Sequence, residues 1–385
     1  MAKTSDLYDV IIIGAGLTGL TLAAKCRQLG LKFLLLEAKD IPGGSLRPNV
    51  TQEGRLPSSL GFIPDTHLAR ERLAHLSELL QDTLAGEGLE VPPLTVKSGE
   101  FKPFVGFADL DIKSVELFSH FNQSPAIRLE SMPDHWVERL LELVESQVMT
   151  RAEVTQFVLD AAESKLSAVI INGDKTLTAK SFFFTGPVSS LNELFDARDL
   201  SQKSRQMLAK AKSWTALSLH LKHSESFVPP EGLAPVEQSN LVFLLGSKNE
   251  PEPAVGRFFP KENTSSWLGF IPSEFGEDSE FAGEALRHIK KLVRRAFALD
   301  EAAIVSEKIT LSAETQGQIS LKTKSPNQLN EAPNLYLASP TLSESQGLEA
   351  ALDMALQAGQ WLEANLVETE SLPTKELRVR DLGQE

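Results

Sequence analysis

The sequence predicts an α/β fold with a nucleotide-binding β-α-β unit near its N-terminal end, and three observations carry this prediction. Residues 8–13 form a short β-branched apolar run, which is typical of a strand buried on both faces. A glycine-rich segment follows at 14–19, and a second apolar run at 33–36 ends in Glu37. A strand, a glycine turn, a helix and an acid in this order are typical of dinucleotide-binding units.

The glycine turn has the pattern G-x-G-x-x-G. Gly14 permits the tight turn, Gly16 lets the backbone approach a pyrophosphate without a Cβ, and Gly19 lets the helix pack close to the strand. Leu17 and Thr18 begin the helix, whose free N–H groups and positive dipole end would face the phosphates. A purely structural turn is the alternative, but it does not account for the neighbouring strand, helix and acid.

Glu37 follows the second strand, 23 positions after Gly14. At the tip of that strand a carboxylate accepts hydrogen bonds from the ribose 2′- and 3′-hydroxyls and repels a 2′-phosphate. We therefore expect a ligand that is not of the NADP type. Gly30, between the helix and this strand, is well placed to end the helix in a left-handed conformation.

A second glycine pair decides between NAD and FAD. After Glu37 and Ala38 the chain reaches Gly43 and Gly44, and Arg47 follows, in the pattern E-x5-G-G-x-x-R. This segment resembles the FAD-dependent superfamily of amine oxidases, protoporphyrinogen oxidases and phytoene desaturases. Two adjacent glycines let a second backbone segment close over the pyrophosphate, and an arginine can pair with it. The alternative is a Pro-Gly-Gly loop with a solvated arginine.

The same resemblance implies roles for five later residues. Gly61 lies in a segment that passes near the flavin ring, and Val154 matches the valine whose backbone pairs with the adenine edge. Gly186 lies in the turn by which the chain leaves the FAD domain. Gly347 and Leu348 begin a helix whose N-terminus points at the pyrimidine edge of the flavin.

One departure falls at the flavin end. Where the superfamily has Gly-Asp at the end of its closing strand, with the carboxylate on the ribityl chain, this chain has Ser339 and Pro340. Proline offers neither an N–H nor a side-chain hydrogen bond. The small Ser-Gly pair expected further along the helix is likewise Met354 and Ala355.

The resemblance implies a Rossmann-like FAD-binding domain of the glutathione-reductase type with an inserted α+β substrate domain. The expected FAD-binding domain comprises residues 1–66, 150–190 and 331–367, the substrate domain 67–149 and 191–330, and a polar tail 368–385. Periodicity predicts helices from Thr66 to a break at 86–88, at 134–148 and at 281–298. It predicts strands at 166–171, 176–184, 241–245, 257–259, 267–271 and 304–311, a half-exposed strand at 217–222, and a hairpin turn at Asn172-Gly173. The resemblance implies two further strands, at 153–159 and within 333–340.

Composition bounds the possible partners. The chain has 385 residues, long enough for two domains, and a formal net charge of −14. This charge disfavours nucleic acid and plain electrostatic docking to anionic membranes. A basic cluster at Lys290, Lys291, Arg294 and Arg295 is predicted to be a solvated helix face.

Location and redox state follow from other features. No segment approaches the ~18 to 20 unbroken apolar residues of a transmembrane helix. The polar N-terminus enters the first strand directly, so no secretory signal peptide is expected. One cysteine, Cys26, cannot form an intramolecular disulfide and is expected to be buried in the first helix. A cytoplasmic location is therefore expected.

A bound flavin would supply the redox chemistry, and no catalytic side chain is identified. We expect no metal site, because the seven histidines lack metal-like spacing and the pair His220 and His223 is expected among solvated neighbours. FAD is expected to be non-covalent, because no cysteine lies near the C-terminal flavin segment. With only Tyr8 and Tyr336 available, an aromatic cage for an amine is disfavoured, and an apolar small-molecule substrate is expected.

The resemblance thus implies an FAD-dependent oxidoreductase that abstracts hydride from a C–N or C–C bond. Two alternatives stay open. One is a pseudoenzyme or nucleotide-stabilised binding protein with a degenerate flavin site, motivated by Ser339 and Pro340. The other is a non-redox flavoenzyme of the UDP-galactopyranose mutase type, which would need a cluster of sugar-diphosphate-binding arginines.

Overall fold

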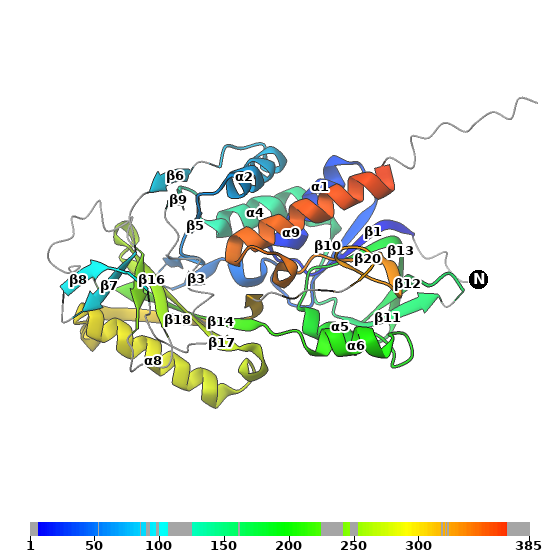
Figure 1. Ribbon diagram of the computed structural model, residues 1–385. Coiled ribbons are helices and arrows are strands. Elements are labelled where there is room, and N and C mark those ends of the chain that lie inside the picture. The colour runs from blue at the N-terminus through cyan, green and yellow to red at the C-terminus, as the bar shows by residue number, and fades with distance from the viewer. Residues whose placement is uncertain are drawn as a thin grey trace, which may run out of the picture.

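The computed structural model shows a mixed α/β architecture built on two large sheets (Figure 1). It describes residues 7–52, 54–84, 86–89, 93–97, 100–106, 125–160, 162–224, 242–246, 253–316, 319, 321 and 323–367. The polar tail expected at 368–385 lies outside these residues. Within the described part, no helix has the length and apolar character needed to cross a bilayer.

The first sheet has eight strands among the described residues, with parallel pairing at its centre. β1 (Tyr8–Ile13) lies between β2 (Phe33–Leu36) and β13 (Lys175–Phe184) and is parallel to both. On the β2 side lies β10 (Val148–Met149). On the other side β12 (Lys165–Ile171) pairs with β13, and β11 (Val154–Asp160) pairs with β12. β20 (Ala332–Leu337) also pairs with β13, and β19 (Gln328–Leu329) pairs with β20. The predicted hairpin turn is confirmed, because Asn172 and Gly173 both have positive φ.

Helices cover both faces of this sheet, which is why the adjoining segments 10–13, 33–36 and 182–184 of its central strands are apolar. Alternate residues of β1 enter opposite cores: Ile12 packs under α1 (Leu17–Gln28), and Ile11 packs on the side of α5 (Leu191–Leu194). The core under α1 also holds α2 (His67–Leu80), α4 (Pro133–Val144) and α9 (Gly347–Leu362), and α6 (Gln202–Ala209) follows α5 on the other side. Cys26 is fully buried in α1, as expected.

The second sheet is antiparallel except where β15 meets β7. Its order in the described residues is β18 (Ile304–Gln316), β14 (Trp214–His223), β17 (Thr264–Pro272), β16 (Ala254–Phe259), β15 (Phe243–Leu245), β7 (Leu94–Lys97) and β8 (Glu100–Pro103). α8 (Ser279–Phe297) lies along its outer face (Figure 1). The opposite face carries a separate apolar cluster that includes Leu60 and Phe104.

Several short elements lie between or beside the strands and helices of the two sheets. They are the 3-10 turns η1 (Gly44–Leu46), η3 (Glu145–Gln147), η4 (Val188–Ser190), η5 (Pro260–Glu262), η6 (Ser273–Phe275), η7 (Glu301–Ala303) and η8 (Pro340–Leu342), the π-helical η9 (Glu363–Val367), the pair β3 (Asn49–Thr51) and β4 (Gly54–Leu56), and the set β5 (Phe62–Pro64), β9 (Ala126–Leu129) and β6 (Gly86–Leu89). β18 contacts both η1 and η8, so the edge of the second sheet reaches the glycine pair and the end of β20.

Two predicted helix ends are wrong. The helix from Thr66 ends at Leu80 because Gln81 adopts a left-handed conformation, and Gly86 belongs to strand β6 rather than to a break. The helix expected to reach Val148 ends at Val144, since Val148 pairs with β2. At Val148 long-range strand pairing thus overrides the local helical pattern, whereas at Gln81 the backbone conformation ends the helix.

The expectation of a half-exposed strand at 217–222, with solvated histidines, is also wrong. β14 lies between β18 and β17, and His220 and His223 are each 2% exposed. His220 Nδ1 lies 2.9 Å from Ser266 Oγ, and His223 Nε2 lies 2.8 Å from Ser265 Oγ. Successive strand residues face opposite ways, so the two imidazoles lie on opposite faces of the sheet. Burial lowers the pKa of both from 6.5 to about 4.

This burial predicts a loss of stability in acid. The unfolded chain takes up protons on these imidazoles below pH 6.5, whereas the folded chain does so only near pH 4, so the free energy of unfolding falls over this range. We expect a loss of roughly 2 to 3 kcal/mol per histidine by pH 4. Urea unfolding at pH 7 and pH 4.5 measures it.

His220→Asn keeps a polar group near Ser266 without an imidazole, and should flatten this pH dependence. His135→Asn, at an exposed position of α4, is the matched control and should not flatten it. An unchanged pH slope in His220→Asn would contradict the assignment.

Candidate functional site

The glycine turn at the end of β1 is built on close backbone contacts. A Cβ on Gly19 would lie 1.9 Å from the Gly14 carbonyl oxygen, so only glycine lets α1 begin this close to the strand. Gly14 itself has a φ of +103°. A Cβ on Gly16, by contrast, would meet no atom within 4 Å. Gly14 and Gly19 therefore serve packing, and Gly16 borders open space.

A hydroxyl from β13 holds the other side of this turn. Thr185 Oγ1 lies 3.0 Å from the carbonyl oxygens of both Ile13 and Gly14. Gly186 follows it, and a Cβ there would lie 2.8 Å from the Phe184 ring. Sequence reasoning did not single out Thr185, although a hydroxyl directly after the three phenylalanines that end β13 was an available signal.

The second glycine pair closes onto the first. Gly43 donates its backbone N–H to the Ala15 carbonyl oxygen at 2.7 Å, and a Cβ on Gly44 would lie 3.1 Å from Gly16 Cα. Both glycines have positive φ. Arg47, half-buried, comes directly after η1. Two segments that are far apart in the sequence thus meet beside the open space at Gly16.

Glu37 holds the same turn from the side of β2. Its Oε2 accepts the Ala15 N–H at 2.9 Å, and its Oε1 accepts the Lys39 N–H at 2.9 Å. Two oxygens offer about four acceptor sites, so ribose hydroxyls can still bind. The Ala152 N–H donates to the Glu37 carbonyl oxygen, which brings Val154 alongside.

Around the end of β1 the structure thus collects twelve of the predicted site residues: Gly14, Gly16, Leu17, Thr18, Gly19, Glu37, Ala38, Gly43, Gly44, Arg47, Val154 and Gly186. They present glycine backbone, one carboxylate, one arginine and a helix N-terminus. This donor set fits an adenosine and a pyrophosphate.

The region expected at the flavin end is less complete. Ser339 is buried, and its Oγ lies 3.0 Å from Thr341 Oγ1 within the turn that Pro340 begins. Gly347, with a φ of +60°, and the half-buried Leu348 begin α9, whose N-terminus carries a positive partial charge. These residues supply a dipole but no carboxylate for a ribityl chain.

A buried ionic network fixes the start of α9 and was missed by sequence reasoning. Arg72 of α2 forms ion pairs with Glu349 and, at 2.7 Å, with Asp353, and it donates to Ser345 Oγ at 2.9 Å. All three charged side chains are at most 10% exposed. Burial raises the pKa of Glu349, which Arg72 partly offsets. Two carboxylates four positions apart on an apolar helix were the available signal.

Gly61 lies apart from the glycine turn, at the inner face of the second sheet. A Cβ on it would lie 2.9 Å from Arg257 Nη1, and Arg257 donates from this atom to the Leu60 carbonyl oxygen at 2.8 Å. The guanidinium stacks on Phe62 at 4.5 Å and on Phe259 at 4.7 Å. It is 5% exposed, and burial lowers its pKa to about 9.

Arg257 begins a polar row on this face. In the strand register Arg257 lies opposite Ser266, and Ser266 lies opposite His220, so all three side chains share one face. His220 Nε2 is buried, with no hydrogen-bond partner in the described part of the chain. Sequence reasoning placed Arg257 only at the start of a strand, although a charge in an apolar run of six was a signal.

Comparisons with known proteins agree with this geometry. The family model for an NAD(P)-binding Rossmann-like domain matches residues 12–71. L-amino-acid oxidases of Echis ocellatus and Daboia russelii are 30% and 29% identical over 123 residues. The match covers 30% of this chain and 24% of each relative, so it spans about a quarter of the length of these relatives.

Solved structures resemble nearly the whole chain. An oxidoreductase from Methanosarcina mazei has a TM-score of 0.66 at 12% identity, covering 91% of this chain and 99% of that one. Cyclohexylamine oxidase from Brevibacterium oxydans has a TM-score of 0.62 at 15% identity, covering 94% of this chain and 100% of that one. Putrescine oxidase bound to putrescine has a TM-score of 0.62 at 13% identity, covering 93% of this chain and 99% of that one. At these identities the likeness shows the fold.

The predicted fold class is thereby confirmed: a mixed α/β chain with a Rossmann-like dinucleotide-binding domain. The family model thus covers the dinucleotide-binding segment, and the structures of the amine oxidases share the fold of the chain.

Gly16→Val tests the phosphate side of the site. The added side chain would fill the space beside Gly44, so we expect FAD affinity to fall by at least about a hundredfold, because pyrophosphate contacts are charge-assisted. The fold should persist, since no atom lies within 4 Å of the new Cβ. Isothermal titration with FAD and a thermal melt measure both effects.

Gly19→Ala is the matched control for packing. Its Cβ would clash with the Gly14 carbonyl oxygen, so this variant should lose stability itself. FAD affinity unchanged in Gly16→Val would contradict the phosphate assignment.

Proposed function

We propose that this protein is an FAD-dependent oxidoreductase that removes hydride from a C–N or C–C bond of a small, mainly apolar molecule. The observation that carries the proposal is the contact between the two glycine segments, in which Gly43 bonds Ala15 and Gly44 approaches Gly16. A second backbone segment over the pyrophosphate site distinguishes this arrangement from a single glycine loop.

The residues around β1 would hold the adenosine half of FAD. Glu37 would accept the ribose hydroxyls, Val154 would pair with the adenine edge, and Arg47 would bind the pyrophosphate beside Gly16 and the glycine pair. FAD would be held non-covalently, because Cys26, the only cysteine of the chain, is enclosed in α1 and burial raises the pKa of its thiol.

The ring end would rely on the N-terminus of α9. Its dipole at Gly347 and Leu348 favours negative charge on the pyrimidine edge, and the Arg72 network holds the helix in position. When bound, FAD supplies the hydride acceptor. The protein would then contribute position, electrostatics and exclusion of water.

We further propose that the substrate lies against the inner face of the second sheet, near Gly61. This face is mostly apolar, with Phe104 and Phe270 in its cluster, and Arg257 is the charged group nearest Gly61. This proposal includes a division into two domains. The FAD-binding domain would comprise residues 1–66, 150–190 and 331–367, and the substrate domain residues 67–149 and 191–330. The names of the sequence relatives, L-amino-acid oxidases, and of the structural neighbours, putrescine oxidase and cyclohexylamine oxidase, favour a C–N bond.

A second candidate is a nucleotide-stabilised binding protein with an inactive flavin site. The observation that favours it is the turn at Ser339 and Pro340, which lacks the superfamily's carboxylate and whose serine hydroxyl bonds within the turn.

Purification and a visible spectrum test both candidates. We expect a yellow protein that releases FAD on denaturation, and whose flavin is bleached anaerobically by a member of a panel of alkylamines, L-amino acids and unsaturated hydrocarbons, then restored by an added acceptor. Gly16→Val serves as the flavin-free control.

The other outcomes separate the candidates. Bound FAD that dithionite bleaches but no panel compound bleaches would favour the binding protein. A colourless protein that takes up no added FAD would exclude the oxidoreductase and leave the nucleotide-stabilised binding protein.

A further inference from the structure

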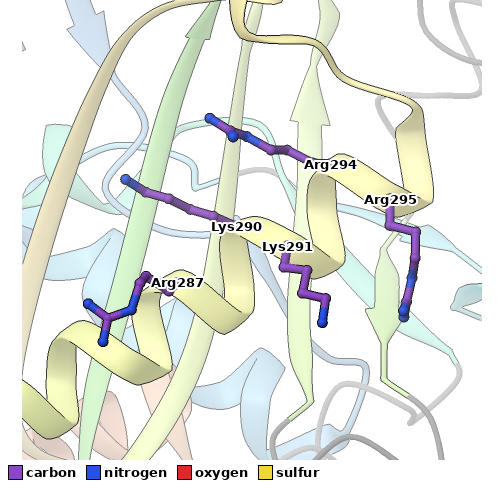
Figure 2. Close-up of a pocket in the computed structure, with 5 residues that line it drawn as sticks. All are labelled: Arg287, Lys290, Lys291, Arg294 and Arg295. Atoms are coloured by element: carbon purple, nitrogen blue, oxygen red, sulfur yellow. The ribbon is translucent and has the colours of Figure 1, made fainter.

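The outer face of the second sheet carries a concentration of positive charge that the flavin chemistry does not use. Arg287, Lys291 and Arg295 recur every four residues of α8 and are exposed, while Lys290 and Arg294 are half-buried beside them. The five line an open surface hollow of about 530 Å³. Figure 2 shows Lys290 and Arg294 reaching across the neighbouring strands, with Lys291 and Arg295 extending from the other side of the helix.

Local structural roles account for part of this cluster. Lys290 pairs with Glu307 of β18 at 2.6 Å, and Arg287 lies 4.0 Å from Glu284. Cations in the last turn of a helix complement its dipole, which explains Arg294 and Arg295, but this effect does not extend to Arg287 in the middle of α8. The sequence of α8 itself has five Lys or Arg residues against two Glu residues, so the helix carries a net positive charge.

An exposed aliphatic stripe lies beside these cations. Val305, Ile309 and Leu311 of β18 are 55%, 39% and 46% exposed. In the register Ile309 lies opposite Leu219 and Leu311 opposite Leu217, and both leucines pack under α8. Ile309 and Leu311 are therefore on the same face of the sheet as α8. Glu307, between Val305 and Ile309, joins it to Lys290.

We propose that this face, formed by α8 and β18, docks on an anionic lipid surface. The chain has a net charge of −14, so an anionic bilayer repels most of the molecule and attracts this face, which sets the orientation. Cations beside exposed aliphatic side chains match the boundary between lipid headgroups and acyl chains.

The shape of the face favours a membrane over an acidic polypeptide. α8 has 19 residues, roughly 28 Å of helix, and lies along the outside of the sheet (Figure 1). It offers a broad surface with its aliphatic stripe to one side. The face is opposite the one that holds Arg257 and Gly61, so docking leaves the proposed substrate side away from the lipid.

Vesicle cosedimentation of the full chain tests the proposal. Wild type should bind vesicles of phosphatidylcholine with phosphatidylserine at low salt, bind them less as salt rises, and not bind pure phosphatidylcholine. Arg287→Glu/Lys291→Glu/Arg295→Glu should lower the partition coefficient by at least about tenfold. Val305→Thr/Ile309→Thr/Leu311→Thr, which keeps strand-forming residues, should lower the binding that persists at high salt.

A charge-matched control separates this face from overall charge. Lys203→Glu/Lys210→Glu/Lys212→Glu changes the net charge equally at exposed positions around α6, and should bind as wild type does. Thermal melts confirm that each variant is folded.

Three outcomes would overturn the proposal. The first is that wild type does not bind anionic vesicles, and the second is that the control variant loses vesicle binding as much as the charge-reversed variant. The third is that polyglutamate competes fully with the vesicles while the threonine variant binds them as wild type does, which would assign the face to an acidic polypeptide. Light scattering that shows a dimer lost in the threonine variant, without vesicle binding, would assign the face to a second copy of the chain.

Discussion

The contact between Gly14 and Gly19 is the constraint on which the rest of the site depends. With no Cβ on Gly19, α1 begins against the Gly14 carbonyl oxygen, and its N-terminal N–H groups lie at the carboxyl end of the parallel sheet. Three neighbouring segments then bind the same short turn: Thr185 reaches its carbonyls, Glu37 accepts the Ala15 N–H, and Gly43 donates to the Ala15 oxygen. A Cβ on Gly14 would lie 2.5 Å from Thr185 Oγ1, and a Cβ on Gly19 would meet the Gly14 carbonyl oxygen, so a side chain at either position would disturb the turn.

Two buried arginines show how the fold uses desolvated charge. Arg72 is neutralised by Glu349 and Asp353, so it holds α9 against α2 at the point where the helix N-terminus is needed. Breaking such a buried pair by removing one partner costs about 3 to 5 kcal/mol. Arg257 is held differently, by the Leu60 carbonyl and two phenylalanine rings, and its pKa is depressed by burial. It ties the second sheet to the segment around Gly61.

The second sheet separates two environments. Its inner face meets the nucleotide-binding part through an apolar cluster and a polar row, whereas its outer face packs α8 and carries exposed cations and aliphatic side chains. β14, in the interior of the sheet, is buried on both sides, which places one histidine in each environment and couples stability to acid through both.

The sequence by itself determined the features that depend on local backbone chemistry and spacing. These are the glycine turn, the acid after β2, the glycine pair before Arg47, the Asn172-Gly173 hairpin and the left-handed Gly30. Each follows from φ, from the absence of a Cβ, or from the distance along a strand. Only the tertiary structure decided that β14 is buried, that Gly86 enters a strand, and that Arg72 and Arg257 are enclosed. The physical reason is that burial and strand pairing depend on partners far away in the chain, which local periodicity does not encode.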